Sequence, residues 1–515
     1  MTPTTSRIEL MDTTLRDGEQ TRNVSFSPEE KVNIGKALLK KLKVDRIEVA
    51  SARVSDGEQQ AVRTLNEWAS EQGCLDRIEI LGFVDGTKSV DWITQAGGQV
   101  INLLTKGSEL HCRKQLKKTL EEHVIDIRAT IAYAHQQGLR VNMYLEDWSN
   151  GYANSPDYVF ALMDEVQDLS IERFLLPDTL GVLSPNEVYD AIKAMTCRYP
   201  QLHFDFHPHN DYGLATANVV AAVKAGIKGI HGTINCLGER AGNASLAEVA
   251  VVLKDKMNIE LSLDEHQIFS LSKMVERFSG KWVSANAPIV GDDVFTQTAG
   301  IHADGDHKGG LYESVLSPER FQRKRSYALG KMSGKASLIK NLDELGISLS
   351  KENQEKVLAK VVQLGDSKQV ITLDDLPFII ADVLESSHIK HVVLIECEIV
   401  STFGGQSKIE IALELNGDLH RSSGTGNGGF DAFVNAINKI LASIPFSLPD
   451  LVNYEVHIPK GGTTSALTES IITWNAEGRT IKTRGVHANQ VFSAIFATLR
   501  VVNLQLHELY SSQRS

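Results

Sequence analysis

Short β-rich segments alternate with helical stretches through the first half of the chain, and this alternation constrains the fold more than any other feature. Near-continuous apolar strands separated by helices are typical of a parallel sheet covered on both faces. Eight strand–helix units in about 230 to 260 residues match a (β/α)8 TIM barrel, and a doubly wound open sheet is the alternative. The predicted strands are Ile8–Asp12, Arg46–Ser51, Ile78–Phe83, Val100–Thr105, Arg140–Asp147, Arg173–Asp178, His203–His209 and Gly229–Ile234.

The starts of two predicted helices support this division. Ser27 and Ser184 each stand directly before a proline and three residues before a glutamate. Serine at the N-cap, proline at the first helical position and glutamate at the third form a capping box. The first helix then carries apolar residues at helical spacing, as expected of a helix that lies on a barrel.

Composition excludes several classes of protein. The 515 residues are 42% hydrophobic and 23% charged, with a net charge of −12, and no apolar run reaches the ~18 residues of a membrane span. The acidic balance disfavours a nucleic-acid partner. The first twelve residues lack a basic stretch followed by an apolar run, so we expect a cytoplasmic protein. The five cysteines are odd in number and far apart, which argues against disulfides and a thiolate zinc site.

The length suggests about three domains. We expect a catalytic barrel over residues 1–265, helical linker subdomains over 266–387, and a C-terminal α+β region over 388–515 with Gly-rich turns.

The C-terminal region contains an internal repeat. Two similar halves should pack about a pseudo-two-fold axis, with a groove for a small ligand between them; a purely structural duplication used for dimerisation is the alternative. At a constant offset of 59 the matched residues are Ile395 with Tyr454, Ile399 with Ile458, Asn416 with Asn475, Gly426 with Gly485, Phe433 with Phe492, and Ile440 with Leu499.

Polar residues follow most of the predicted barrel strands, at the end where barrel enzymes place their catalytic groups. Arg16 and Asp17 follow the first strand, and Glu146 ends the fifth. His207 and His209 lie on one face of the seventh strand, because side chains at i and i+2 point the same way. Two histidines and a carboxylate such as Asp17 would bind a divalent ion with positions left open for substrate and water, although H-x-H alone is also an ordinary pair.

Three segments together resemble the acyl-CoA condensing enzymes that make isopropylmalate, citramalate and homocitrate. They are Asp12–Gln20, His207–Asp211 and Gly238–Asn243. The first is shared with related lyases and aldolases, whereas the G-E-R-A-G-N segment is similar to the synthases. The resemblance covers essentially the whole chain and is strongest to the citramalate branch. Pro208 and Cys236 depart from it, where small residues are usual.

The resemblance implies roles for site residues. Asp17, His207, His209 and Asn243 would hold Mn²⁺, Zn²⁺ or Mg²⁺, which chelates a 2-oxoacid. Arg16 would stabilise the charge that develops on the ketone oxygen, and Thr179 would bind the substrate carboxylate. Acetyl-CoA is the second substrate, and Glu146 is the candidate base, or supports it. In the linker region, His302, Asp304 and Tyr312 would assist catalysis and CoA binding in a neighbouring subunit's barrel, unless they form an ordinary surface loop.

The resemblance also indicates the substrate side chain and the regulation. Leu81, Leu104 and Tyr144 would face that side chain; their bulk leaves room for a methyl group and favours pyruvate, unless they are only barrel core. Isoleucine would then be the feedback effector, in a homodimer. The candidate groove residues are Phe430, Asp431, Leu451, Tyr454, Ile458, Thr464, Leu467 and Gln490.

Other functions fit some of these features. A 2-isopropylmalate synthase would use 2-oxoisovalerate and respond to leucine. A lyase or aldolase shares the first motif and the two histidines, but needs no duplicated C-terminal region. A catalytically inactive barrel that binds an amino acid would have no reason to keep two buried imidazoles and a carboxylate together.

Overall fold

The computed structural model describes residues 7–307, 311–366, 371, 373, 376–383, 391–457, 468–476 and 479–512. These residues form two compact units. The first comprises Met1–Phe295 with Ser314–Arg325, and the second comprises Thr296–Glu313 with Ser326–Ser515.

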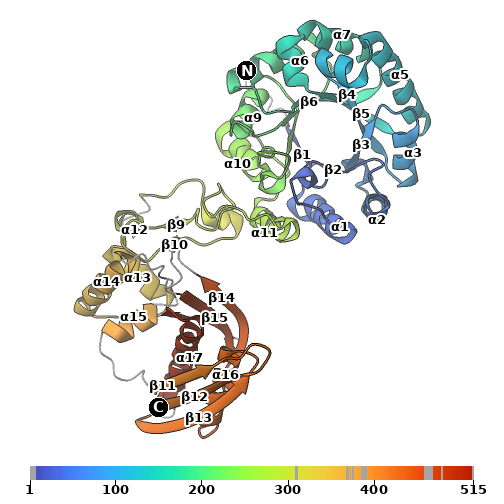
Figure 1. The fold of residues 1–515 in the computed structure, drawn as a ribbon. Helices are drawn as coiled ribbons and strands as arrows, with labels where there is room; N and C mark the ends of the chain where they lie inside the picture. The colour runs from blue at the N-terminus through green and yellow to red at the C-terminus, as the bar shows by residue number, and fades with distance from the viewer. Residues whose placement is uncertain are drawn as a thin grey trace. The chain divides into compact units, whose positions relative to one another are not determined.

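The first unit contains a closed barrel of eight parallel strands with helices around it (Figure 1). β1 pairs with β8 as well as with β2, so the sheet has no edge and the doubly wound alternative is wrong. All eight predicted strands are present; β2 and β3 have the predicted bounds, and the ends of the others differ by at most two residues. They are β1 Glu9–Asp12, β2 Arg46–Ser51, β3 Ile78–Phe83, β4 Val100–Lys106, β5 Arg140–Glu146, β6 Ile171–Asp178, β7 Phe204–Pro208 and β8 Gly229–Gly232.

The helices of this unit cover the barrel and share one large hydrophobic core with the strands. The predicted capping box is present at the start of α1. The Ser27 N–H donates to the Glu30 carboxylate, and the Glu30 N–H donates to the Ser27 hydroxyl oxygen. Ser184 and Glu187 form the second. The helices are α1 Pro28–Lys36, α2 Asp56–Glu71, α3 Lys88–Gln95, α4 Glu109–His111, α5 Leu120–Gln136, α6 Trp148–Asn154, α7 Pro156–Val166, α8 Pro185–Arg198, α9 Ala215–Lys224, α10 Leu246–Met257 and α11 Ile268–Ser279.

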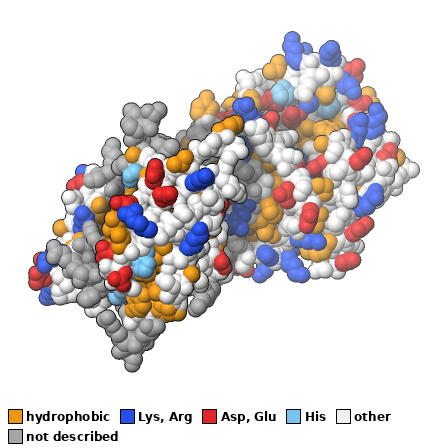
Figure 2. Space-filling model, turned by 60° about the horizontal axis from the view of Figure 1, so that its bottom comes forward, with side chains coloured by type: hydrophobic (Ala, Val, Ile, Leu, Met, Phe, Trp, Pro, Cys, Tyr) orange, Lys and Arg blue, Asp and Glu red, His pale blue; other side chains and the backbone are white. Residues whose placement is uncertain are grey.

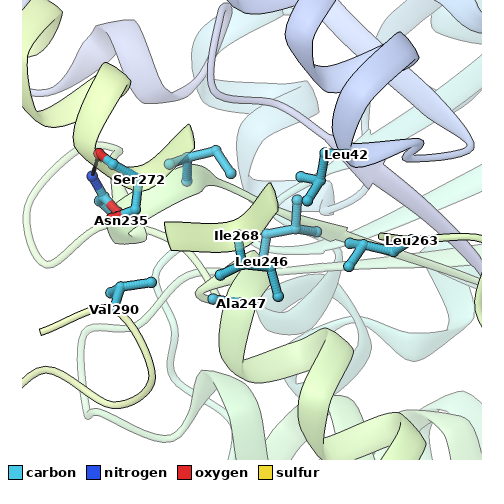
Figure 3. A pocket seen from close by; sticks show the side chains of 9 residues that line it. Leu42, Asn235, Leu246, Ala247, Leu263, Ile268, Ser272 and Val290 are labelled. Carbon is cyan, nitrogen blue, oxygen red and sulfur yellow. Dashed lines mark hydrogen bonds between the residues drawn. The ribbon is translucent and has the colours of Figure 1, made fainter. Parts of the chain in front are cut away.

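A small apolar cavity lies where α10 and α11 meet the loop after β8 (Figure 3). Its volume is about 10 Å³, which leaves room for one water molecule at most. Asn235 and Ser272 exchange hydrogen bonds beside it, at 2.9 Å and 2.5 Å. Asn235 therefore connects the barrel to α11.

The second unit begins with a helical part. Its short strands β9 Thr296–Gln297 and β10 Ser326–Tyr327 pair with each other. The helices are α12 Gly300–His307, α13 Lys335–Glu344, α14 Lys351–Asp366 and α15 Leu376–Val383, and the last three share a small hydrophobic core.

The rest of the second unit has two halves of one design, each a three-stranded antiparallel sheet followed by a helix. The first half is β11 Val392–Val400, β12 Ser407–Leu415, β13 Asp418–Gly426 and α16 Gly429–Leu441. The second is β14 Asp450–His457, β15 Thr468–Ala476, β16 Arg479–His487 and α17 Gln490–Ser512. One hydrophobic cluster joins the first half to α17 and a second lies within the second half, and Phe430 and Leu448 pack against both.

The constant offset of 59 between these halves is wrong. Leu394 pairs with Leu413 beside a bulge in β11, as Leu451 pairs with Trp474 beside the same bulge in β14. Leu451 follows Leu394 by 57 residues, whereas Trp474 follows Leu413 by 61. The connection between the first two strands is four residues longer in the second half, since it comprises residues 458–467 rather than 401–406. Five of the six matched pairs have both members among the described residues, and none of these five is structurally equivalent; the sixth includes Ile458, which lies outside the described residues.

None of the described helices has the length and apolarity that crossing a membrane requires. Basic and acidic side chains are interspersed on the face shown in Figure 2. The five cysteines are free thiols.

Candidate active site

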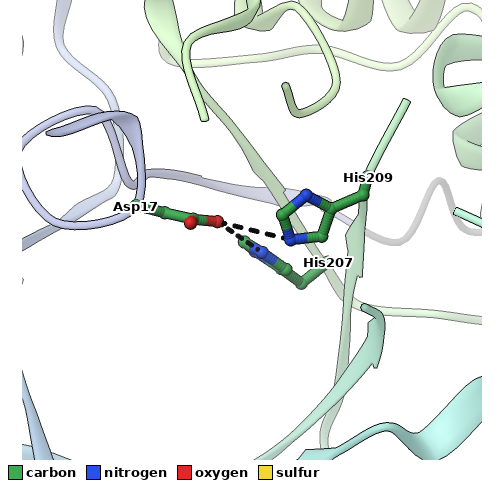
Figure 4. A group of neighbouring side chains, drawn as sticks. All are labelled: Asp17, His207 and His209. Carbon is green, nitrogen blue, oxygen red and sulfur yellow. Dashed lines mark ion pairs between the residues drawn. The ribbon is translucent and has the colours of Figure 1, made fainter. Parts of the chain in front are cut away.

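Asp17, His207 and His209 meet at the carboxyl end of the barrel strands (Figure 4). Asp17 follows β1, His207 is on β7, and His209 lies one residue beyond it. The Asp17 Oδ2 atom is 2.9 Å from His207 Nε2 and 3.6 Å from His209 Nε2. All three side chains are buried, and one ligand atom from each lies within 4.8 Å of the others. The fold thus brings Asp17 together with two predicted histidine ligands that follow it by about 190 residues in the sequence.

The loop that carries Asp17 is fixed by its own hydrogen bonds. The Asp12 carboxylate accepts from the Thr14 N–H and hydroxyl, both at 2.9 Å. Thr14 in turn accepts from the Ile234 N–H at 2.8 Å, which ties the loop to the end of β8. The N–H of Asp17 donates to the Thr13 carbonyl at 2.8 Å. Burial raises the pKa of Asp12 to about 7.

The charges around these three residues suit a divalent cation. Burial acts to raise the pKa of the Asp17 carboxyl, but the Arg16 guanidinium and His207 outweigh it and hold that pKa below its usual range. Burial lowers the pKa of His207, and it lowers the pKa of His209 to about 4. A carboxylate beside two neutral imidazoles is the donor set that metal ions require.

Asn243, the fourth predicted ligand, lies beside His209, to which its backbone is paired in an isolated bridge. Its amide nitrogen donates to the Leu237 carbonyl at 2.9 Å. Its amide oxygen is buried and has no hydrogen-bond partner among the described residues. A buried acceptor without a partner is costly, and a cation supplies one. The four residues therefore fit a divalent metal ion.

Arg16 is held beside this group. Its Nε donates to the Glu48 carboxylate at 2.5 Å, and its Nη1 lies 3.5 Å from Asp17 Oδ1. Glu48 also accepts from the Asn102 amide at 2.7 Å. Only about a tenth of the Arg16 side chain is exposed. The guanidinium is thus a fixed positive charge next to the candidate metal centre.

An apolar wall lies beside Arg16. Leu81, Tyr144 and Leu175 form a small buried cluster, and Phe83 and Leu104 pack against it; we call these five residues the apolar wall. The structure brings together the three predicted wall residues. Sequence reasoning missed Leu175 and Phe83. The strand register explains why these two residues belong to the wall, because Leu175 pairs with Tyr144 and Phe83 pairs with Leu104.

Glu146 ends β5 and forms an ion pair with Lys106, the last residue of β4. A quarter of the Glu146 side chain is exposed, whereas Lys106 is buried. The Lys106 backbone is fixed, since its N–H donates to His123 Nε2 and its carbonyl accepts from the Tyr158 hydroxyl, both at 3.1 Å. Sequence reasoning missed Lys106, although a lysine at the end of an apolar strand signals a charged site.

Thr179 follows β6, and its hydroxyl oxygen accepts from the Asp147 N–H at 3.0 Å. Its carbonyl accepts from Arg240 of the G-E-R-A-G-N segment at 2.7 Å. Arg240 also pairs with Asp211 at 2.8 Å. The predicted motifs after β6, β7 and β8 are therefore joined at this end of the barrel. Of the two unusual residues, Pro208 ends β7, and Cys236 has a φ of +57°, which favours the glycine that is usual there.

His302, Asp304 and Tyr312 belong to the second unit. His302 and Asp304 are on α12, and the His302 and Tyr312 ring centroids are 4.3 Å apart. A Cβ atom on Gly305 would lie 2.4 Å from the Tyr312 ring, so the close approach requires glycine there. The structure thus brings His302 and Tyr312 into contact; the action of His302, Asp304 and Tyr312 in a second subunit stays a prediction.

Five of the predicted groove residues are described. The Phe430 and Tyr454 ring centroids are 5.4 Å apart, and Asp431 accepts from the Asn427 N–H at 2.8 Å. Leu451 is half-exposed on β14, and Gln490 begins α17. Phe430 and Tyr454 thus connect the two halves. Ile458, Thr464 and Leu467 lie outside the described residues.

Comparison with known proteins identifies the class. The HMGL-like family profile matches residues 7–275, the homocitrate synthase post-HMGL domain-like profile matches 289–369, and the LeuA allosteric (dimerisation) domain profile matches 370–506. The chain belongs to the HMGL-like family, in its branch of citramalate and isopropylmalate synthases.

Three relatives illustrate the position within this branch. The putative (R)-citramalate synthase of Archaeoglobus fulgidus is 33% identical, over 97% of this chain and 99% of that protein. The (R)-citramalate synthase of Methanocaldococcus jannaschii is 31% identical, over 97% and 100%. The 2-isopropylmalate synthase of the same organism is 33% identical, over 96% and 94%. Identity alone therefore does not separate the two activities.

Proposed function

We propose that this protein is an acyltransferase that condenses acetyl-CoA with pyruvate and hydrolyses the thioester, giving (R)-citramalate and CoA. The observation that carries this proposal is the apolar wall beside Arg16 and the candidate metal centre. Leu81, Tyr144 and Leu175 are each less than 5% exposed. A wall of large, tightly packed side chains has room for the methyl group of pyruvate but not for an isopropyl group.

A divalent ion, Mn²⁺, Zn²⁺ or Mg²⁺, held by Asp17, His207, His209 and Asn243 would supply a Lewis acid for the ketone of the 2-oxoacid. Arg16 stabilises the negative charge that forms on the ketone oxygen, because its guanidinium is already held in place by Glu48. Thr179 binds the carboxylate of the 2-oxoacid through its hydroxyl proton, since its oxygen already accepts from Asp147.

Glu146 is the candidate base that takes a proton from the methyl group of acetyl-CoA. It is partly exposed at the end of β5 and so within reach of a substrate, and the ion pair with Lys106 holds the carboxylate in place. His302 and Tyr312 would assist enolisation and thioester hydrolysis, and Asp304 and Tyr312 would contact CoA, in a homodimer.

Regulation by isoleucine is part of the proposal. The LeuA allosteric (dimerisation) profile matches the duplicated region, and Phe430, Asp431 and Tyr454 supply apolar rings and a carboxylate for an amino-acid ligand. A 2-isopropylmalate synthase, with leucine as its effector, is the second candidate, because a relative with that name is equally similar.

The test is CoA release from acetyl-CoA with saturating pyruvate or 2-oxoisovalerate, each with Mn²⁺ or Mg²⁺. We expect at least a 100-fold preference in kcat/KM for pyruvate, because 2-oxoisovalerate has two extra methyl groups and each one that does not fit costs about 1–3 kcal/mol. A preference for 2-oxoisovalerate would overturn the assignment of the wall and favour the second candidate. Release with neither 2-oxoacid would overturn the proposed reaction.

A further inference from the structure

A line of buried polar side chains runs across the inside of the barrel from the apolar wall. The hydroxyl of Tyr144, on β5, is 3.1 Å from Nδ1 of His231 on β8. The Nε2 atom of His231 is 3.0 Å from Oδ2 of Asp205 on β7. The three side chains are 2%, 0% and 0% exposed. Nothing in the proposed reaction uses His231 or Asp205.

The structure makes room for Asp205 and holds it in place. A Cβ atom on Gly229 would lie 2.0 Å from Asp205 Oδ1, so only glycine fits at that position of β8. Arg46 forms an ion pair with Asp205 Oδ2, and His203 Nε2 lies 2.9 Å from Oδ1. Arg46 also pairs with Glu79 at 2.7 Å. The carboxylate is therefore fixed and ionised beneath His231.

These contacts decide where the proton of His231 lies. An ionised carboxylate accepts hydrogen bonds only, so His231 donates to Asp205 through Nε2–H. A neutral imidazole then has an unprotonated Nδ1, which accepts the proton of the Tyr144 hydroxyl. The Tyr144 oxygen is left to accept from Arg16 Nη2, which lies 3.4 Å away.

We propose that His231, oriented by Asp205, is a positioning residue that fixes the ring of Tyr144 in the apolar wall and thereby sets which 2-oxoacid fits. This inference rests on the proposed function. The ring of Tyr144 is edge-on to His207, at a centroid distance of 5.9 Å, and the guanidinium of Arg16 is 5.8 Å from its centroid. Without its acceptor at His231, the buried O–H proton of Tyr144 would have no hydrogen-bond partner, and the ring would move away from the position that excludes larger side chains.

Two substitutions of His231 separate its two hydrogen bonds. His231→Gln places an amide where Nε2 was, keeping a donor for Asp205 and removing the acceptor for Tyr144. His231→Asn places an oxygen where Nδ1 was, keeping the acceptor for Tyr144 and removing the donor for Asp205. His203→Gln is the matched control, because His203 is the other histidine on Asp205 and its described contacts do not include Tyr144.

The measured quantity is the ratio of kcat/KM for pyruvate to kcat/KM for 2-oxobutanoate, which is longer by one methylene. We expect His231→Gln to lower this ratio about tenfold, mainly by raising KM for pyruvate, with kcat changed less than threefold. Tyr144→Phe should lower it similarly, and the double variant should be no worse than either single variant. His231→Asn should keep most of the wild-type ratio, because it keeps the acceptor for Tyr144. His203→Gln should leave the ratio unchanged. An unchanged ratio in folded His231→Gln, or an equal loss in His203→Gln, would overturn the proposal.

The nitrogen chemical shifts of His231 test the same contacts without turnover. We expect the Nε2–H tautomer in the wild-type protein, and a shift of the Nδ1 signal in Tyr144→Phe that is absent in His203→Gln. An Nδ1–H tautomer would overturn the proposal even if His231→Gln fails to fold. If neither 2-oxoacid releases CoA, the proposed function fails, while these spectra still decide whether His231 holds Tyr144.

Discussion

The barrel and the duplicated C-terminal region differ in how sequence positions become positions in space. In the barrel, Asp17 and His207 meet because each follows or ends a parallel strand, and the carboxyl ends of all eight strands lie at one end. In the duplicated region, the sequence alone matches residues of the two halves by counting along the chain. Four extra residues in one connection change the offset from 57 to 61.

The comparison teaches that topology tolerates insertions, whereas repeat counting does not. Loops between barrel strands can change length without moving the strand ends, so the predicted ligands converge. In the duplicated region an insertion changes the offset between equivalent residues of the two halves for every later position. Gly424 and Gly485 are the true equivalents, because each lies against the carbonyl of the matching helix residue, Ala432 or Ser493.

Removing the divalent ion should have the largest effect on activity. It should not change the structure of the duplicated region. We expect a chelator to lower CoA release at least about 1,000-fold, since the ligands alone supply no Lewis acid. Added Mn²⁺ should restore it, and hydrogen exchange of β12 and β15 should stay the same throughout. Full activity in metal-free protein would contradict the metal role of Asp17, His207 and His209.

Glu146→Gln tests whether the carboxylate at the end of β5 is the catalytic base. We expect kcat to fall about 100-fold or more with KM for pyruvate within threefold, because an amide cannot take the proton of acetyl-CoA. The control is Glu172→Gln, near the start of β6 at the opposite end of the barrel. An unchanged kcat would remove Glu146 from catalysis.

The two equivalent glycines test the corrected repeat. A Cβ atom would lie 2.3 Å from the Ala432 carbonyl oxygen at Gly424, and 1.9 Å from the Ser493 carbonyl oxygen at Gly485. We expect Gly424→Ala and Gly485→Ala each to destabilise their own half by about 2–3 kcal/mol, since the helix must move away. Faster hydrogen exchange in β13 or β16 would report this. Gly428→Ala, where a Cβ atom meets nothing within 4 Å, is the control; equal losses there would refute the steric explanation.

The buried side chain of His123 should make the stability of the barrel depend on pH, and we expect this effect to be smaller than the others. Burial, with the charge of Lys118, lowers its pKa from 6.5 to about 4. The unfolded state therefore binds more protons below pH 6.5, and the free energy of unfolding falls as the pH drops towards 4. From pH 7 to pH 5 this loss is about 1–2 kcal/mol. His123→Gln, which keeps an acceptor for the Lys106 N–H, should remove that part of the loss in urea unfolding. An identical pH dependence in both proteins would contradict the assignment.

Side-chain partners inside the barrel were harder to predict than strand ends. The bulk of Leu81 and Tyr144 suggested a wall, but Leu175 and Phe83 joined it through strand register. Lys106 was missed because its importance depends on Glu146, which is 40 residues away in sequence. Periodicity indicates which face a residue is on, but not which side chain it meets across a closed sheet.

Local patterns and motifs at strand ends were enough to predict the eight strands, the capping boxes, the metal-ligand candidates and the existence of two similar C-terminal halves. The closure of the barrel through β1 and β8, the pairing of Lys106 with Glu146, and the contacts from Tyr144 through His231 to Asp205 are known from the three-dimensional arrangement alone. Those contacts join strands on different sides of the barrel. They depend on distances that close only when the sheet does, and no local pattern records such distances.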